Sequence, residues 1–293
     1  MTYVVAGVTG NTGGAAAETL LAGGQKVRVI VRDPAKGDGW KDRGAEVAVA
    51  DLRDGRALAA ALVGAQGAYL LVPPNNTAED FAAYQHEVID TLVAATRSTH
   101  VPHVVLLSSI GAHLPSGTGP IVALHRAEAE LGAIPGTALT SIRAGYFMEN
   151  LGGNFGMLPQ GLVGSFVPQD LPIEMIASAD VGRTAAAALR EGPAHAGILE
   201  LGGPARTMRD VAAVMSTVVG RPLTVAEAPV SVMAATLTGY GLSASLAGRY
   251  AEMTEAMIAG RVSFEGGHRR VLGSTSLEEF LPSFFARMSA GGR

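Results

Sequence analysis

The first strand and turn of this chain constrain its fold more than any other segment. Residues 3–6 are apolar, and the sequence Gly7-Val-Thr-Gly10-Asn-Thr-Gly13 leads from them into a stretch rich in alanine and leucine at residues 15–22. A short apolar run predicts a buried strand, and the small residues after the glycines predict a helix packed closely on a sheet. Gly7 would allow the tight turn after the strand, and Gly10 would let the backbone approach a pyrophosphate. Gly13 would let the helix pack close to the sheet. This order of elements predicts a dinucleotide site.

The end of the second predicted strand favours one cofactor. Residues 26–31 form another short apolar run, which ends in Arg32-Asp33-Pro34. Sites that prefer NAD usually place a carboxylate here, whereas the Arg32 guanidinium suits the 2′-phosphate of NADP or the face of an adenine ring. Two alternatives stay open: Asp33 binds the ribose after a different turn, or Arg32 is a solvated residue paired with Asp33. We predict NADP(H), with NAD(H) as the less favoured cofactor.

Strands and helices alternate through the first half of the chain. This alternation predicts an α/β fold, a doubly wound parallel sheet of the Rossmann type, with a smaller α-rich C-terminal part that covers the substrate. Residues 1–150 are expected to form the NAD(P)-binding domain. Residues 151–293 are expected to add its remaining elements (about 176–204) and the substrate-covering segments (about 151–175 and 205–293). The predicted strands after the second are residues 46–50, 67–72, 103–107, 137–143 and 197–201.

The second half of the chain is less regular. Residues 150–172 are rich in glycine and proline and are expected to run over the surface. Thr207 and Asp210 have the spacing of a capping box before a helix that ends near residue 219. Residues 230–260 contain Met233, Met253 and Met257 and predict an apolar helical cap, for which core packing is favoured over a pocket.

Composition excludes several kinds of protein. The chain of 293 residues has 48% hydrophobic and 16% charged residues, so a large core is expected and disorder is not. No apolar run is long enough to cross a bilayer, no cysteine is present, and the start of the chain lacks a signal-peptide pattern. These features favour a cytoplasmic enzyme without a membrane partner.

The charged and metal-binding residues exclude two further classes of partner. The formal charge of −4 without a basic cluster argues against nucleic-acid binding. The seven histidines lack metal-ligand spacing, so no metal site is predicted. Nothing in the sequence indicates the oligomeric state.

The distribution of lysines restricts the chemistry. Lys26, Lys36 and Lys41 are the only lysines in the chain. A Schiff-base lysine in the later part of the chain is therefore excluded. So is the Tyr-x-x-x-Lys dyad with which ordinary short-chain dehydrogenases lower a tyrosine pKa and hold the nicotinamide ribose.

With these features the chain resembles the NmrA-like family, atypical members of the short-chain dehydrogenase superfamily, in their quinone-reductase-like branch. The glycine motif at residues 7–13, Val31-Arg-Asp-Pro34 and the helix start Ser178-Ala-Asp-Val-Gly-Arg183 carry part of the resemblance. The rest lies in Arg143-Ala-Gly-Tyr-Phe-Met-Glu-Asn150, which is similar to the family's Arg-Pro-Gly-x-Phe-x-Glu-Asn segment. Ala144 replaces the usual proline and leaves only the local turn in doubt.

The resemblance implies roles for individual residues. Arg32 would lie beside the adenosine 2′-phosphate, and Asp51 and Leu52 would flank the adenine. His125 stands about where an ordinary relative has its lysine and Ile121 where it has its tyrosine, so His125 and Tyr146 are the only catalytic candidates, both weak. The pyrophosphate would be bound by Gly7, Thr9, Gly10, Asn11, Thr12 and Gly13, the ribose and nicotinamide path would be lined by Val72, Pro73 and Pro74, and the substrate would meet Tyr146, Phe147 and Asn150.

Each of these roles has a structural alternative. Asp51 would instead cap the next helix, and Phe147 and Met148 would simply pack between the sheet and the cap. A single histidine such as His125 is more often a surface or core residue than a ligand.

Two functions compete on this evidence. The leading one is an NADPH-dependent reductase of a small apolar acceptor such as a quinone, since hydride transfer to a quinone needs alignment more than acid catalysis. The absence of the Tyr/Lys dyad argues against sugar epimerisation, dehydration and ordinary alcohol oxidation. The alternative is a non-catalytic NADP(H) redox sensor that regulates a protein partner, and the missing dyad is its main support.

Overall fold

The computed structural model of the protein describes the backbone of residues 2–291 and the side chains of residues 2–288. Its main feature is an eight-stranded sheet in the order β13-β10-β6-β5-β4-β1-β2-β3, in which every pair of neighbours is parallel. The strands are β1 (Thr2–Val5), β2 (Lys26–Val31), β3 (Glu46–Val49), β4 (Ala65–Leu70), β5 (His103–Ser109), β6 (Ala138–Ala144), β10 (Ile198–Gly202) and β13 (Arg269–Leu272).

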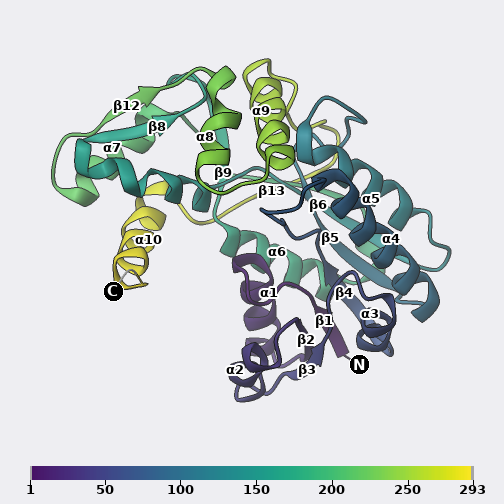
Figure 1. Cartoon of the computed structure of the whole chain (residues 1–293). Helices are drawn as coiled ribbons and strands as arrows, with labels where there is room; N and C mark the ends of the chain where they lie inside the picture. The colour runs from purple at the N-terminus through teal and green to yellow at the C-terminus, as the bar shows by residue number, and fades with distance from the viewer. Residues whose placement is uncertain (1, 292–293) are drawn as a thin grey trace.

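Helices cover both faces of this sheet (Figure 1). One face packs on α1 (Asn11–Ala22) and α6 (Ser178–Glu191), and the other on α3 (Gly55–Leu62), α4 (Phe81–Thr99) and α5 (Val122–Gly132). The two helices of the first face lie very close together, because a Cβ at Gly182 would sit 2.5 Å from both the Ala15 Cβ and the Thr12 carbonyl oxygen. The short η1 (Pro34–Gly37) and α2 (Asp38–Lys41) follow β2.

The strand order reverses at β1. The chain first builds outward through β2 and β3, then returns to the other side of β1 with β4. In parallel α/β sheets, ligands bind at such a switch point, beyond the carboxyl ends of the two central strands. The segments that leave β1 and β4 here are the glycine turn after Val5 and residues 71–74.

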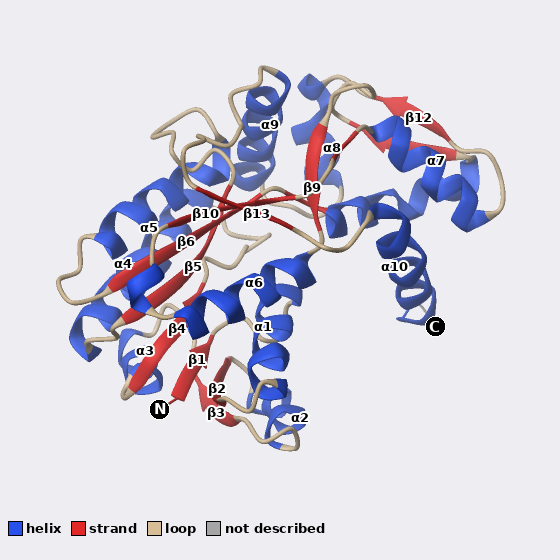
Figure 2. Ribbon diagram, turned by 180° about the vertical axis from the view of Figure 1, so that it is seen from behind, coloured by secondary structure: helices blue, strands red, loops and turns tan. Residues whose placement is uncertain are grey.

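A second lobe stands beyond the carboxyl ends of the strands (Figures 1 and 2). It has its own apolar core, which includes Leu151, Met175, Met215 and Leu281. Its elements are β7 (Tyr146–Phe147), η3 (Met148–Gln160), β8 (Leu162–Ser165), β9 (Ile173–Ile176), β11 (Ala205–Arg206), α7 (Met208–Val219), β12 (Thr224–Glu227), η5 (Val230–Val232), α8 (Met233–Gly239), α9 (Ala244–Ile258) and α10 (Leu277–Gly291). The short η2 (Gly119–Ile121) and η4 (Pro193–His195) precede α5 and β10.

The structure confirms the predicted α/β class and the doubly wound parallel sheet. The capping box is also confirmed: Thr207 Oγ1 accepts from the Asp210 N–H at 3.1 Å, and the Asp210 carboxylate accepts from the Thr207 N–H at 2.8 Å. In the described chain, no helix has both the length and the apolar character needed to cross a membrane.

One expectation from the sequence is wrong. Residues 150–172 do not simply run over the surface, because η3 buries Leu151, Asn154 and Leu158 in the second lobe and β8 follows it. Glycine and proline made this segment resemble a loop, yet its spaced apolar residues fill a core. Strand β13 was not among the predicted strands. Its four residues, two of them exposed arginines, carry almost no local signal, and the pairing with β10 defines them.

Candidate functional site

A large cavity of about 930 Å³ lies beyond the carboxyl ends of the strands. At one end it is lined by the glycine turn, through Gly7, Gly10, Asn11 and Thr12, and at the other by the second lobe, through β7, β9 and α9. A smaller pocket of about 410 Å³ shares Gly7, Leu71 and Pro74 with it. The two spaces therefore meet at the switch point, on either side of the β1 and β4 ends.

The glycine turn has the backbone that a phosphate site requires. Gly7 has a φ of +68°, and a Cβ there would sit 2.5 Å from the Leu71 Cδ2. Gly10 is the N-cap of α1 and supplies no side-chain cap, so the first N–H groups of the helix stay available to an anion. Gly13 lines neither space; its Cβ would lie 2.5 Å from the Ala6 carbonyl oxygen, so it sets the distance between helix and strand. The residues present fit a dinucleotide pyrophosphate.

The smaller pocket gathers the residues assigned to the adenosine end, Arg32, Asp51 and Leu52, together with Thr9 and Pro73. They come from the four segments that follow β1, β2, β3 and β4. Val72 lines the large cavity instead, and Pro74 lines both spaces. A cofactor laid across the switch point would thus have its adenosine in the smaller pocket and its nicotinamide in the larger one.

Asp51 does not take the structural role considered for it from sequence. Asp54, not Asp51, caps α3 by accepting from the N–H groups of Arg56 and Ala57, both at 3.0 Å. Asp51 accepts instead from the Arg53 N–H at 2.9 Å. Burial raises the pKa of Asp51, but its hydrogen bonds from Arg53 outweigh this and hold it below its ordinary value.

Arg32 does not form the ion pair with Asp33 that was considered as an alternative from sequence. Asp33 caps η1 by accepting from the Ala35 N–H at 3.0 Å. Among the described residues the ion pairs include none between Arg32 and Asp33. The exposed Arg32 side chain therefore stays at the pocket wall with its guanidinium available to an anion.

The assigned substrate residues lie together on the large cavity. Tyr146 and Phe147 form the short β7, and Asn150 follows them in η3. Burial raises the pKa of Tyr146 to about 12, and its polar contact with the Asn150 amide lowers that pKa by less. A phenol with such a pKa is a poor proton donor near neutral pH, which weakens Tyr146 as a general acid. Met148 packs into the second core, as the structural alternative had it.

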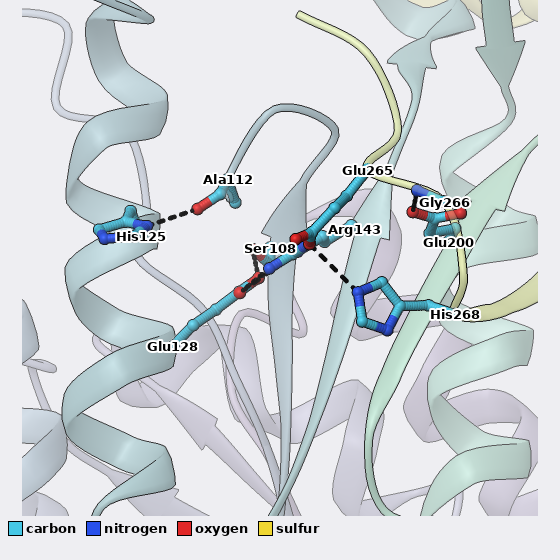
Figure 3. Close-up of polar contacts among 9 residues, drawn as sticks. All are labelled: Ser108, Ala112, His125, Glu128, Arg143, Glu200, Glu265, Gly266 and His268. Atoms are coloured by element: carbon cyan, nitrogen blue, oxygen red, sulfur yellow. Dashed lines mark hydrogen bonds and ion pairs between the residues drawn. The ribbon is translucent and has the colours of Figure 1, made fainter. Parts of the chain in front are cut away.

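The positions that correspond to the missing dyad differ in their surroundings. Ile121, the position that the resemblance aligns with the tyrosine of ordinary relatives, is buried and lines the large cavity with an alkyl side chain. His125, one helical turn later, lines neither space; its Nδ1 lies 2.9 Å from the Ala112 carbonyl oxygen (Figure 3). The structure thus does not bring His125 to the cavity wall.

A buried ionic network lies behind the cavity (Figure 3). Arg143, 5% exposed near the end of β6, forms a hydrogen bond of 2.7 Å to Glu128 of α5 and one of 2.6 Å to Glu265. Ser108, a lining residue, donates to the same Glu128 carboxylate at 2.5 Å, and Glu265 also accepts from His268 at 3.1 Å. The network joins β5, β6, α5 and the segment before β13.

The structure adds residues to the site that were not assigned from sequence. Ser108 and Ser109 end β5, the neighbour of β4, and the rule that ligands bind beyond the carboxyl ends of parallel strands would have indicated them. The helix α9 contributes Tyr250, Met253 and Met257 to the cavity wall. The expected core packing of the methionine stripe holds for Met257, which also packs on the core of the second lobe, whereas Met253 lines the cavity. Glu174 and Phe264 had no local signal, because only the folded second lobe brings them to the cavity.

Comparison with known proteins assigns the family. A sequence model of the NmrA-like family matches residues 1–281, and the chain belongs to that family. An NAD(P)H azoreductase of Xenophilus azovorans is 28% identical over 257 residues, or 83% of each chain. The resemblance inferred from the motifs is therefore confirmed.

Solved structures agree on the fold. The triphenylmethane reductase of Citrobacter sp., solved with NADP(H), matches with a TM-score of 0.80 and 19% identity over 97% of this chain and 100% of its own. An NADPH-dependent quinone oxidoreductase of Escherichia coli, solved with NADPH, matches with a TM-score of 0.71 and 23% identity over 98% of this chain and 100% of its own.

Proposed function

We propose that this protein is an NADPH-dependent reductase that transfers a hydride to a small apolar acceptor such as a quinone. The observation that carries the proposal is a single cavity of about 930 Å³ with a glycine turn at one end and an apolar wall at the other. Ligand sites of this kind span about 300–1,000 Å³, so the cavity has room for the nicotinamide half of a cofactor and an acceptor side by side.

The geometry of the turn and of the smaller pocket supports the cofactor end of this proposal. The free N–H groups of α1 would bind the pyrophosphate, and Arg32 would pair with the 2′-phosphate. NADPH, when bound, supplies the hydride. The expected enzyme class and cofactor agree with the names of the relatives, an NAD(P)H azoreductase and an NADPH-dependent quinone oxidoreductase.

The acceptor end suits a reaction with little acid catalysis. Ile121 replaces a hydroxyl at the cavity wall, and the raised pKa of Tyr146 keeps that phenol protonated. A quinone that accepts a hydride becomes a hydroquinone anion, which takes its proton from solvent without help from the protein. The wall would hold the acceptor flat and exclude water, so that alignment provides most of the rate enhancement.

The second candidate is a redox sensor, because a cofactor site without the Tyr/Lys dyad also suits a protein that only binds NADP(H). Acceptor turnover separates the two functions. The test is NADPH oxidation with 1,4-naphthoquinone, followed together with NADPH binding by calorimetry. The reductase predicts saturable turnover; binding without turnover over a panel of quinones would favour the sensor.

A further inference from the structure

The large cavity has one charged side chain in its wall. Among the described residues that line it, Glu174 of β9 alone carries a charge; the others are apolar, aromatic, glycine or neutral polar. Its position is built by two glycines: a Cβ at Gly145 would lie 2.7 Å from the Glu174 carbonyl oxygen, and one at Gly202 would collide with the Glu174 carboxylate. The two glycines at the ends of β6 and β10 thus leave room for the Glu174 backbone and carboxylate beside the cavity, which Glu174 lines.

The partner of Glu174 stands outside the cavity. Arg270 of β13 forms an ion pair with Oε2 of Glu174, and its guanidinium stacks on the Phe264 ring with the Cζ 4.1 Å from the ring centroid. Arg270 does not line the cavity, and in the part of the chain that the structure describes Oε1 of Glu174 receives no hydrogen bond. Of this ion pair, only Glu174 therefore belongs to the cavity wall, and Arg270 lies outside it.

The aromatic part of the cavity wall also favours a positively charged ligand. Five aromatic side chains line the cavity, and the negative faces of such rings attract cations. They are Phe81, Tyr146, Phe147, Tyr250 and Phe264. A sulfonate or carboxylate in this space would approach a carboxylate and aromatic faces with no lining cation to receive it, and such repulsion strengthens where water is excluded.

We propose that Glu174 makes the acceptor site selective for charge, so that it takes aromatic acceptors bearing an ammonium or other cationic group and rejects anionic ones. This inference rests on the proposed function, since it concerns the acceptor half of the same cavity. The free oxygen of Glu174 receives the cationic group of the acceptor, and the aromatic wall covers its rings.

The test uses three naphthoquinones that share one ring system: unsubstituted, with a trimethylammonium substituent, and with a sulfonate substituent. In the wild-type protein, kcat/KM for the cation should exceed that for the sulfonate by about tenfold, the size expected of a desolvated contact between a quaternary ammonium and an aromatic wall that carries a carboxylate. Glu174→Gln should bring this ratio near one, whatever its effect on turnover of the unsubstituted quinone. A ratio that stays unchanged in Glu174→Gln, or a wild-type preference for the sulfonate, would overturn the inference.

The chain offers a closely matched control. Glu191 of α6 pairs with Arg269, the neighbour of Arg270, at 2.6 Å; the Glu191 and Glu174 side chains are 34% and 33% exposed. Glu191 does not line the cavity, so Glu191→Gln should leave the charge ratio unchanged. If Glu174→Gln does not fold, the salt dependence of the wild-type ratio is measured in its place. Raising the salt above about 0.1 M, where the Debye length is about 10 Å, should reduce the preference of the protein for the cationic quinone.

A binding experiment separates this inference from the proposed function. Two redox-inert naphthalenes, one with the trimethylammonium group and one with the sulfonate, are titrated by calorimetry into the protein with NADP⁺ present. Tighter binding of the cation without any quinone turnover would refute the reductase and support the charge selectivity. Quinone turnover with equal binding of the two naphthalenes would support the reductase and refute the selectivity.

Discussion

Arg143 and Glu265 lie 122 residues apart in the sequence, yet Nη1 of the arginine donates to Oε2 of the glutamate at 2.6 Å. Glu265 directly follows Val262, Ser263 and Phe264, which line the large cavity. The N–H of the next residue, Gly266, donates to the buried Glu200 of β10 at 2.7 Å. Two carboxylate contacts therefore hold one wall of the cavity against the sheet.

Replacing Glu265 with glutamine should loosen this wall. The pair is half exposed on the glutamate side, with 45% of the Glu265 side chain accessible, so its loss should cost no more than a surface ion pair. We expect KM for the quinone to rise about two- to fivefold, while the dissociation constant of NADPH stays the same. Steady-state kinetics and calorimetry measure the two quantities.

Glu278→Gln provides the control for Glu265→Gln. Glu278 of α10 pairs with Arg206 at 3.0 Å and does not line the cavity. This variant should keep the wild-type KM. Equal KM values in both variants would show that the Arg143–Glu265 contact has no part in shaping the acceptor wall.

Arg32→Ala should change the choice of cofactor. The arginine lines the adenosine pocket without an ion pair to Asp33, so its replacement removes a charge-assisted contact worth about 1.5–3 kcal/mol, or roughly 10- to 150-fold in NADPH affinity. NADH lacks the 2′-phosphate and should bind as before. Calorimetric titration with both cofactors measures the difference.

Arg43→Ala tests whether a general loss of positive charge accounts for the result. Arg43 pairs with Glu18 at 2.5 Å on an exposed surface and lines neither space. Replacement of Arg43 should leave the affinities for NADPH and for NADH unchanged. If Arg32→Ala weakens NADPH and NADH equally, the assignment of Arg32 to the 2′-phosphate is incorrect.

Gly10 and Gly13 should respond to substitution in opposite ways. Gly10 has extended backbone angles (φ −102°, ψ 173°), and a Cβ there would meet only the Gly7 carbonyl oxygen, at 3.4 Å. Gly10→Val should therefore fold normally and lose both cofactors, because its side chain fills the phosphate position. A Gly13 Cβ would lie 2.5 Å from Ala6 and Gly7 backbone atoms, so Gly13→Ala should lower thermal stability.

Circular dichroism melting curves and cofactor titration of the two glycine variants provide the check. A cofactor-binding Gly10→Val protein would contradict the position of the pyrophosphate. A Gly13→Ala protein as stable as the wild type would contradict the close packing of α1 on β1.

The Asp180 carboxylate should make stability depend on pH. It is 3% exposed and accepts from the Thr275 N–H and the Ser274 hydroxyl, both at 3.0 Å, and from Arg183. Burial raises the pKa of Asp180, but these hydrogen bonds outweigh it, so the folded pKa lies below the unfolded value. The resulting stabilisation is fully present above the unfolded pKa of about 3.9 and is lost as the pH falls through the folded pKa.

Asp180→Asn should accordingly destabilise the protein at pH 7 by about 1.5–3 kcal/mol, and the difference should shrink below about pH 4. Urea unfolding at both pH values measures it. Asp170→Asn, which removes an exposed pair with Arg209, should stay near wild-type stability. A difference between wild type and Asp180→Asn that is the same at both pH values would exclude a titrating Asp180 as its source.

The cofactor half of the site could be predicted because its signal is local. Gly7, Gly10 and Gly13 lie within one turn, and each has a backbone requirement that the sequence displays. Arg32 ends a strand whose position in the sheet follows from its apolar pattern. The parallel sheet was predictable for the same reason, since buried strands and small-residue helices alternate regularly.

Only the segment 146–150 of the acceptor half was predicted, because distant segments build the rest of it. Glu174, Phe264 and Tyr250 come from three separate elements and meet only when the second lobe folds onto the sheet. Strand β13 is defined by its pairing with β10, and the buried Arg143 receives Glu265 from 122 residues away. Such long-range contacts leave no period or motif in the sequence.

The most direct test of the account is a single-turnover oxidation of NADPH by 1,4-naphthoquinone, with deuterium placed at either face of the nicotinamide C4. One cavity that holds both reactants predicts saturable oxidation, slowed by deuterium on one face only, and absent in Gly10→Val. Oxidation no faster than in the absence of protein, despite tight NADPH binding, would contradict the account.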